Sequence, residues 1–296
     1  MLLLDRQPVF LFICRALFFA LAVSFVPSEF TYGQSPLQKD SRYEVIDEAE
    51  AARRLDAFRK QRLKGDFCFR FQLEHLPRRG SSVRYYGSMW GSWNEKGPVT
   101  RIQLNESETG ESKAGVDLIL QNGPEPRAWL RDPSTACFVP LKGDALYQPL
   151  LPEIVYTPFD FLMPFLYWEN YEYAGAKRMR SRVARNFLMV PDVTSVVPDW
   201  LQAVRIGIDD AYNALLHIEI VEKPDRTRSS FTIESFKQVQ GQWIVKGIVL
   251  KDWKSRDRTR FKVLSASVGL TFSHAVFSPT NAIDHPVVPD RLFEDL

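Results

Sequence analysis

The chain has 296 residues, of which 45% are hydrophobic and 25% charged, a balance typical of a globular protein with a substantial core. Its 38 basic residues nearly match its 36 acidic ones, which gives a formal net charge of +2. This charge excludes the strong basic excess that is typical of nucleic-acid-binding proteins. Aromatic residues make up 13% of the chain, and they favour both β-strands and the walls of apolar pockets.

The N-terminus has the features of a secretory signal. Two arginines precede an apolar run over residues 16–26, which is shorter than the roughly 20 residues that span a bilayer. The run fits the apolar region of a signal peptide, and the small residue Gly33 suits the position before cleavage. We therefore predict a signal peptide over 1–33, a polar linker over 34–42 and an exported protein. The alternative is an uncleaved segment that tethers the protein to a membrane.

The hydrophobic pattern changes from helical to strand-like near residue 65. A helix is predicted over Tyr43–Leu63, because apolar residues recur there at steps of three and four. These residues are Val45, Ala49, Ala52, Leu55 and Phe58. From Asp66 onward the period is two, and turn signals separate roughly ten strands.

This pattern predicts a mainly β protein with a few helices (α+β). Because flat sheets of that size are unusual, we expect a strongly curved antiparallel sheet or incomplete β-barrel. It would form a single domain over 43–277. A Pro-rich tail over 278–296 is expected to be loosely ordered.

A strongly apolar segment, 157–168, interrupts the strands. Thr157 is a predicted helix cap, Pro158 suits the first helical position, Asp160 completes a capping box and Pro164 ends the helix. The apolar side chains of this short plug are Phe161, Leu162, Phe165, Leu166 and Trp168. Either they form a lid that contacts a ligand, or they are a permanent part of the core.

Other candidate residues leave further alternatives open. Trp90, Trp93 and Trp129 either line a cavity or fill the core. Arg178, Arg180 and Arg182 share one face of a predicted strand, where they meet lipid head groups or an acidic partner, or are simply solvated. Cys68 and Cys137 either form a disulfide in an oxidising compartment or remain separate.

The sequence contains no recognisable catalytic motif. The four histidines are scattered, and none has a neighbour at metal-ligand spacing. No glycine-rich phosphate loop is present. We therefore expect no enzyme activity, no cofactor and no metal. An envelope hydrolase with a site assembled from distant residues is a third-ranked alternative.

The segment Asp160–Trp168 resembles the corresponding segment of an exported bacterial branch of the LolA-like outer-membrane lipoprotein-sorting family. Further similarities lie at Tyr173–Gly175, in the strand pair over 204–220 and at Gly241–Trp243. One departure is Ser181–Arg182, where the family has a Gly-Arg pair.

The resemblance implies an incomplete barrel wrapped over short lid helices that close an apolar cavity. It implies a periplasmic carrier of lipid or lipoprotein acyl chains in a Gram-negative-type envelope. Inner- or outer-membrane sorting components are then expected partners. Such a carrier is physically reasonable, since each CH₂ group exposed to water costs about 0.8 kcal/mol. The alternative is a non-catalytic interaction or scaffold module on the same fold.

Overall fold

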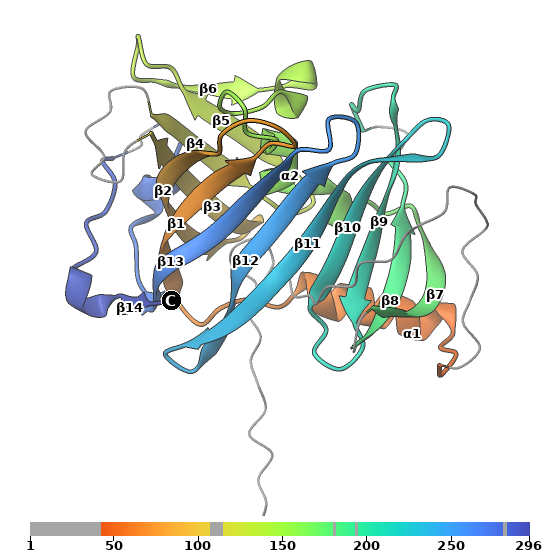
Figure 1. Ribbon diagram of the computed structural model, residues 1–296. Helices are drawn as coiled ribbons and strands as arrows, with labels where there is room; N and C mark the ends of the chain where they lie inside the picture. Colours follow the sequence, from red (N-terminus) through yellow and green to blue (C-terminus); the bar gives the residue numbers. More distant parts are fainter. Residues whose placement is uncertain (1–42, 107–114, 180–181, 193–194, 281–282) are drawn as a thin grey trace, which may run out of the picture.

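The computed structural model describes residues 43–106, 115–179, 182–192, 195–280 and 283–296 (Figure 1). The predicted signal peptide and linker lie outside the described residues. The chain forms one 14-stranded antiparallel sheet in the order β6-β5-β4-β3-β2-β1-β13-β12-β11-β10-β9-β8-β7, with β14 paired to β13. The first seven strands are β1 (Asp66–Leu76), β2 (Val83–Asn94), β3 (Gly97–Asn105), β4 (Val116–Gln121), β5 (Arg127–Arg131), β6 (Phe138–Leu141) and β7 (Tyr171–Met179). The others are β8 (Arg182–Met189), β9 (Leu201–Asp209), β10 (Leu215–Glu222), β11 (Arg226–Val239), β12 (Gln242–Asp252), β13 (Arg258–Leu270) and β14 (Glu294–Asp295).

The sheet curves strongly but does not close, because the edge strands β6 and β7 do not pair with each other in the described part of the chain (Figure 1). Two α-helices lie on its inner face, α1 (Glu48–Arg59) and α2 (Pro158–Leu162). The 3₁₀ helices are η1 (Gly143–Tyr147), η2 (Pro164–Tyr167), η3 (His274–Phe277) and η4 (Asp290–Leu292). The predicted class, mainly β with a curved and unclosed sheet, is confirmed.

Alternation along β1 builds the inner core. The side chains of Phe67, Phe69, Phe71 and Leu73 are all buried in the main hydrophobic cluster. Gly91 pairs with Phe67 across β1 and β2, and a Cβ atom on Gly91 would lie 1.9 Å from the Phe67 ring. The glycine therefore leaves room for the phenylalanine ring to lie across the neighbouring strand.

Helix α1 is shorter than predicted, and its buried stripe shares only Leu55 and Phe58 with the predicted one. It begins at Glu48, where the Asp47 side chain caps it by accepting a hydrogen bond of 2.7 Å from the Glu50 amide. The buried stripe is Ala51, Leu55 and Phe58. The prediction that Val45 and Ala49 belong to it was wrong, and both are exposed. The cap explains this difference, because Val45 precedes the helix and Ala49 lies in its solvated first turn.

The C-terminal tail is not loosely ordered, contrary to our expectation. Residues 283–296 lie along the outer face of the sheet, and β14 extends β13 through pairs with Ser265 and Ala266 (Figure 1). A buried arginine on β3, Arg101, donates hydrogen bonds to the carbonyl oxygens of Val276 (3.1 Å) and Ile283 (2.7 Å). The proline-rich composition of the tail suggested disorder. The contacts that order the tail come from residues far away in the sequence, which the local composition does not reveal.

Candidate functional site

The apolar segment Thr157–Trp168, called the lid segment below, begins with the predicted capping box. The Asp160 amide donates to the Thr157 hydroxyl (3.3 Å), and the Asp160 carboxylate accepts from the Thr157 amide (2.8 Å). Helix α2 ends after one turn at Met163, whose left-handed φ of 43° redirects the chain into η2. Pro158 and Pro164 each begin a helix, as expected of a residue with a fixed φ.

The five predicted apolar residues of the lid segment come together on the inner face of the sheet. Each has an exposed fraction of 5% or less. Aromatic rings join them to their surroundings: Phe161 lies 5.0 Å from Tyr156, and Phe165 lies 6.3 Å from Trp168, measured between ring centroids. The lid segment thus covers the inner face with apolar side chains.

Arg59, at the end of α1, holds the C-terminal half of the lid segment. Its Nε donates to the Leu166 carbonyl oxygen at 2.5 Å and its Nη2 to the Trp168 carbonyl oxygen at 2.8 Å. The guanidinium lies 6.0 Å from the ring centroids of both Tyr167 and Tyr171. Burial lowers the pKa of Arg59 below its ordinary value. Because the cation satisfies carbonyls that a one-turn helix leaves without partners, we describe Arg59 as the latch of the lid segment.

Asn122 holds the other half of the lid segment, since its Nδ2 donates to the Leu162 carbonyl oxygen at 2.5 Å. The sequence pattern predicted neither this contact nor that of Arg59. Both residues are distant from the lid segment along the chain, and neither stands in a motif. A charged residue at the end of an amphipathic helix is expected to face solvent, so the sequence around Arg59 did not predict its contacts with the lid segment.

Two polar groups lie buried beside the apolar rings. Burial raises the pKa of Asp160 to about 6, although hydrogen bonds from Thr157 and the charge of Arg228 act to lower it. The Tyr156 side chain is fully buried, and its hydroxyl has no hydrogen-bond partner among the described residues. Burial also raises the pKa of Tyr156 well above its ordinary value. An unsatisfied buried hydroxyl is uncommon in proteins, and this one is free to donate a hydrogen bond.

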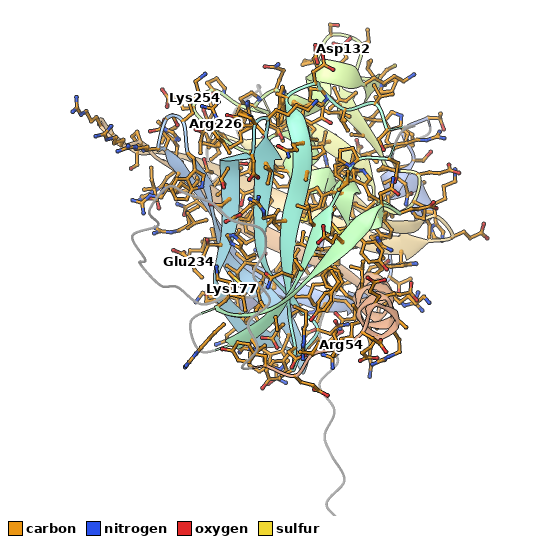
Figure 2. The ribbon with its side chains drawn as sticks, turned by 90° about the vertical axis from the view of Figure 1, so that its right-hand side faces the viewer. Arg54, Asp132, Lys177, Arg226, Glu234 and Lys254 are labelled. Carbon is orange, nitrogen blue, oxygen red and sulfur yellow. The ribbon has the colours of Figure 1, made fainter. Side chains whose placement is uncertain are left out.

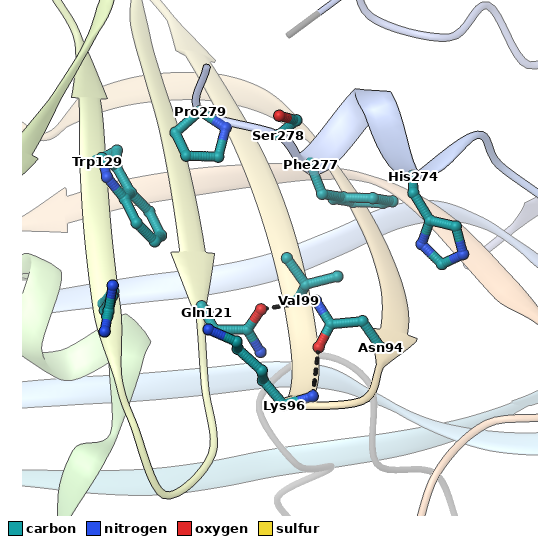
Figure 3. Close-up of a pocket in the computed structure, with 10 residues that line it drawn as sticks. Asn94, Lys96, Val99, Gln121, Trp129, His274, Phe277, Ser278 and Pro279 are labelled. Atoms are coloured by element: carbon teal, nitrogen blue, oxygen red, sulfur yellow. Dashed lines mark hydrogen bonds between the residues drawn. The ribbon is translucent and has the colours of Figure 1, made fainter. Parts of the chain in front are cut away.

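The three predicted tryptophans do not converge on the lid segment. By alternation with Met89, Trp93 lies on the inner side of β2, and the Arg62 guanidinium lies 5.7 Å from its ring centroid. Trp90 belongs to a separate hydrophobic cluster on the outer face. Trp129 lines an outer pocket of about 320 Å³, together with Phe277 and Pro279 (Figure 3). The interpretation that all three line one cavity was therefore wrong.

The predicted basic patch is divided by a turn. Arg178 lies on β7, Arg182 lies on β8, and Arg180 lies outside the described residues. The register pairs Arg178 with Val183 and Arg182 with Met179, so Arg178 and Arg182 point to opposite faces of the sheet. The expectation of one shared strand face was wrong because the chain reverses here. Arg182 instead forms an ion pair of 2.9 Å with Asp209.

Both described cysteines are free, so the possible disulfide does not form in the structure. Cys68 is buried and Cys137 is exposed, and burial raises the pKa of the Cys68 thiol to about 12. Among the described residues, no group of three or more His, Cys, Asp and Glu side chains is arranged to hold a metal ion. The described helices are also too short or too polar to cross a membrane.

No protein-family model and no curated protein matches the sequence. Solved structures do match. A DUF1329 family protein from Desulfovibrio piger has a TM-score of 0.64 at 11% identity over 77% of this chain and 95% of its own. A putative outer membrane lipoprotein-sorting protein domain from Vibrio parahaemolyticus has a TM-score of 0.64 at 12% identity, covering 77% and 94% of the two chains.

A LolA superfamily protein from Nitrosomonas europaea has a TM-score of 0.58 at 13% identity, covering 79% of this chain and 98% of its own. The fold is LolA-like. At these identities the likeness establishes the fold, and the LolA-like sheet places the lid segment on its inner face. The resemblance first noted in the residues of the lid segment is therefore confirmed at the level of structure.

Proposed function

We propose that this protein is an envelope carrier that binds a lipid or the acyl chains of a lipoprotein between the inner face of the sheet and the lid segment. The observation that supports this proposal best is the construction of the lid segment itself. It presents apolar side chains to the inner face, yet its two short helices are joined by one left-handed residue, Met163. In the carrier that we propose, this segment moves as a unit when a ligand enters and leaves an apolar surface behind.

The ligand chemistry follows from what the lid segment covers. Phe161, Phe165 and Leu166 cover apolar surface on the inner face. Exposing that surface to water would cost about 25 cal/mol of free energy per Å². A hydrocarbon chain can replace these side chains on the inner face without exposing that surface. The unpartnered Tyr156 hydroxyl adds a polar contact beside them, and it suits the carbonyl oxygen of an acyl ester.

Export into a periplasm fits this role, because a carrier of acyl chains works between membranes. The sequence of residues 1–33 supports export, and the similar fold of a putative outer membrane lipoprotein-sorting domain supports an envelope role. Inner- or outer-membrane sorting components are the partners that such a carrier requires.

Native mass spectrometry tests the proposal. The chain purified without detergent should carry a discrete added mass that fragments as lipid, or should take up added phospholipid. Replacing the latch by Arg59→Met should accelerate uptake, since it frees the carbonyls of Leu166 and Trp168. Arg53→Met is the matched control on the same helix, because the exposed Arg53 pairs with Glu50 and not with the lid segment.

Two outcomes would count against the carrier. One is a clean mass with no uptake by either variant, and the other is equal uptake rates for Arg59→Met and Arg53→Met. The first result would favour a non-catalytic interaction module, in which the lid segment is a permanent part of the core.

A further inference from the structure

Three neighbouring turns lie together at one end of the sheet (Figure 1). They join β1 to β2, β12 to β13 and β10 to β11. Hydrogen bonds connect them: the Arg78 amide donates to the Asp257 carboxylate at 2.8 Å, and the Trp253 amide donates to the Arg228 carbonyl oxygen at 2.9 Å. The three turns therefore form one continuous surface.

This surface is positively charged. Seven exposed cations lie on the three turns and the adjoining strand ends, and we call them the basic rim: Arg78, Arg79, Lys223, Arg226, Lys254, Arg256 and Arg258. Apart from Arg226, which pairs with Glu222 at 3.1 Å, none forms an ion pair in the described part of the chain. Figure 2 shows Lys254 and Arg226 at this end, away from Lys177 and Arg54.

Nearby carboxylates are engaged in the turns themselves. Asp252 accepts hydrogen bonds from the amides of Lys254 (2.7 Å) and Ser255 (2.8 Å), and Asp225 pairs with Arg205 at 2.6 Å. Burial, together with the neighbouring cations Arg258 and Arg256, lowers the pKa of Lys251. Positive charge is therefore crowded at the rim, although the whole chain is almost neutral.

An exposed indole stands among these cations. Trp253 has an exposed fraction of 41%, and the Lys251 ammonium lies 3.3 Å from its ring centroid. Tryptophan with surrounding lysine and arginine is the composition that favours the polar–apolar boundary of an anionic membrane. An acidic protein would use the charges but would not require the indole.

Successive side-chain contacts run from Arg228, next to the rim, to the lid segment. The Arg228 guanidinium lies 4.2 Å from the Trp200 ring centroid, and Trp200 lies 5.6 Å from Tyr147. Tyr147 lies 4.9 Å from Phe159 in α2. Three successive contacts thus link this end of the molecule to α2, at the start of the lid segment.

We propose that the basic rim and Trp253 form a docking surface for anionic lipid head groups in a bilayer. Docking would bring the N-terminal end of the lid segment to the membrane from which an acyl chain enters. The inference rests on the proposed carrier function for its purpose, but the docking itself is measured separately from cargo binding.

Vesicle co-sedimentation tests the surface. The protein should bind phosphatidylcholine vesicles that contain phosphatidylglycerol, bind pure phosphatidylcholine vesicles much less, and dissociate as salt is added. The double variant Lys254→Glu/Arg256→Glu should lower partition roughly 30-fold or more. Trp253→Ser should weaken binding further at high salt, where the indole contributes more than the charges.

The matched control carries the same charge change away from the rim. Lys237→Glu/Lys262→Glu replaces two exposed lysines on β11 and β13 and should bind as the unmodified protein does. Equal loss in the rim and control variants would show that net charge alone drives binding and would overturn the docking surface. Absence of binding to anionic vesicles would also overturn it.

Cargo uptake by native mass spectrometry separates the two proposals. A protein that takes up lipid but does not bind anionic vesicles keeps the carrier function and loses the docking surface. A protein that binds the vesicles but never takes up lipid keeps the docking surface and loses the carrier function.

Discussion

Arg59 at the end of α1 donates a hydrogen bond of 2.5 Å from Nε to the carbonyl oxygen of Leu166, 107 residues further along the chain. A second bond, to Trp168, makes the guanidinium a two-point attachment for the end of the lid segment. Together with the Asn122 hydrogen bond to the Leu162 carbonyl oxygen, it fastens both halves of the apolar lid segment through side chains from outside it.

The latch predicts a local change in hydrogen exchange. Arg59→Met should destabilise the protein by about 2 kcal/mol, because two buried carbonyls lose a charged donor. Hydrogen exchange should accelerate more at the amides of Met163 and residues 165–168 than at those of the central strands. Hydrogen-exchange mass spectrometry with Arg53→Met as the control measures this. Uniformly faster exchange over the whole sheet would contradict a local latch.

The unpartnered Tyr156 hydroxyl predicts a separation of stability from binding. Tyr156→Phe should leave the free energy of unfolding unchanged or raise it by up to about 1 kcal/mol, because a buried hydroxyl without a partner is removed. The same variant should bind an acyl ester less well but a hydrocarbon of equal length as before. Chemical denaturation and ligand titration measure the two effects. Equal loss for both ligands would contradict a contact with the ester.

Asp160 predicts a pH dependence of stability. Its pKa in the folded protein is about 6, above the ordinary value of 3.8, so between these values the folded state holds a proton that the unfolded state has lost. This contribution is therefore fully present below pH 3.8 and is lost as the pH rises through 6. Its size is roughly 3 kcal/mol from the shift.

Asp160→Asn should remove that dependence, since the amide oxygen can still accept from Thr157 but does not titrate. The difference in free energy of unfolding between the two proteins should change between pH 3.8 and about pH 6 and be constant at higher pH. Parallel pH profiles for the two proteins would show that burial does not raise the pKa of Asp160.

The C-terminal tail predicts the reactivity of a cysteine. Cys68 lies in the outer cluster with Trp90 and Phe277, and Phe293 of the tail packs against that cluster. Removing residues 279–296 should expose Cys68 to a maleimide reagent, whereas the complete chain should protect it. Cys137 is exposed in the structure and serves as the internal reference. Peptide mapping that finds Cys68 equally protected in both proteins would contradict a covering tail.

The sequence predicted those features that are determined locally. The capping box at Thr157 and Asp160 and the alternation of Phe67, Phe69 and Phe71 each depend on spacing within one element. The same alternation separates Trp90 from Trp93, because residues an odd number apart on a strand face opposite sides. Parity along the strand was thus a signal that could have placed Trp90 on the outer face.

The remaining features depend on contacts between distant parts of the chain. Arg59 reaches Leu166 through the fold of the sheet, and Arg101 holds the tail at Ile283, 182 residues away. Nothing in the local pattern around any of these residues specifies its partner. The basic rim was missed for the same reason, since its cations come from three turns that are separated in sequence.

Photo-crosslinking with a diazirine-bearing phospholipid tests the central claim most directly. After irradiation and peptide mapping, the carrier account predicts adducts on the lid segment and on inner-face residues such as Tyr156 and Phe231, which lie 5.8 Å apart between ring centroids. Competition with unlabelled phospholipid should abolish these adducts. Adducts confined to the outer pocket around Trp129, or no specific adducts, would contradict binding beneath the lid segment.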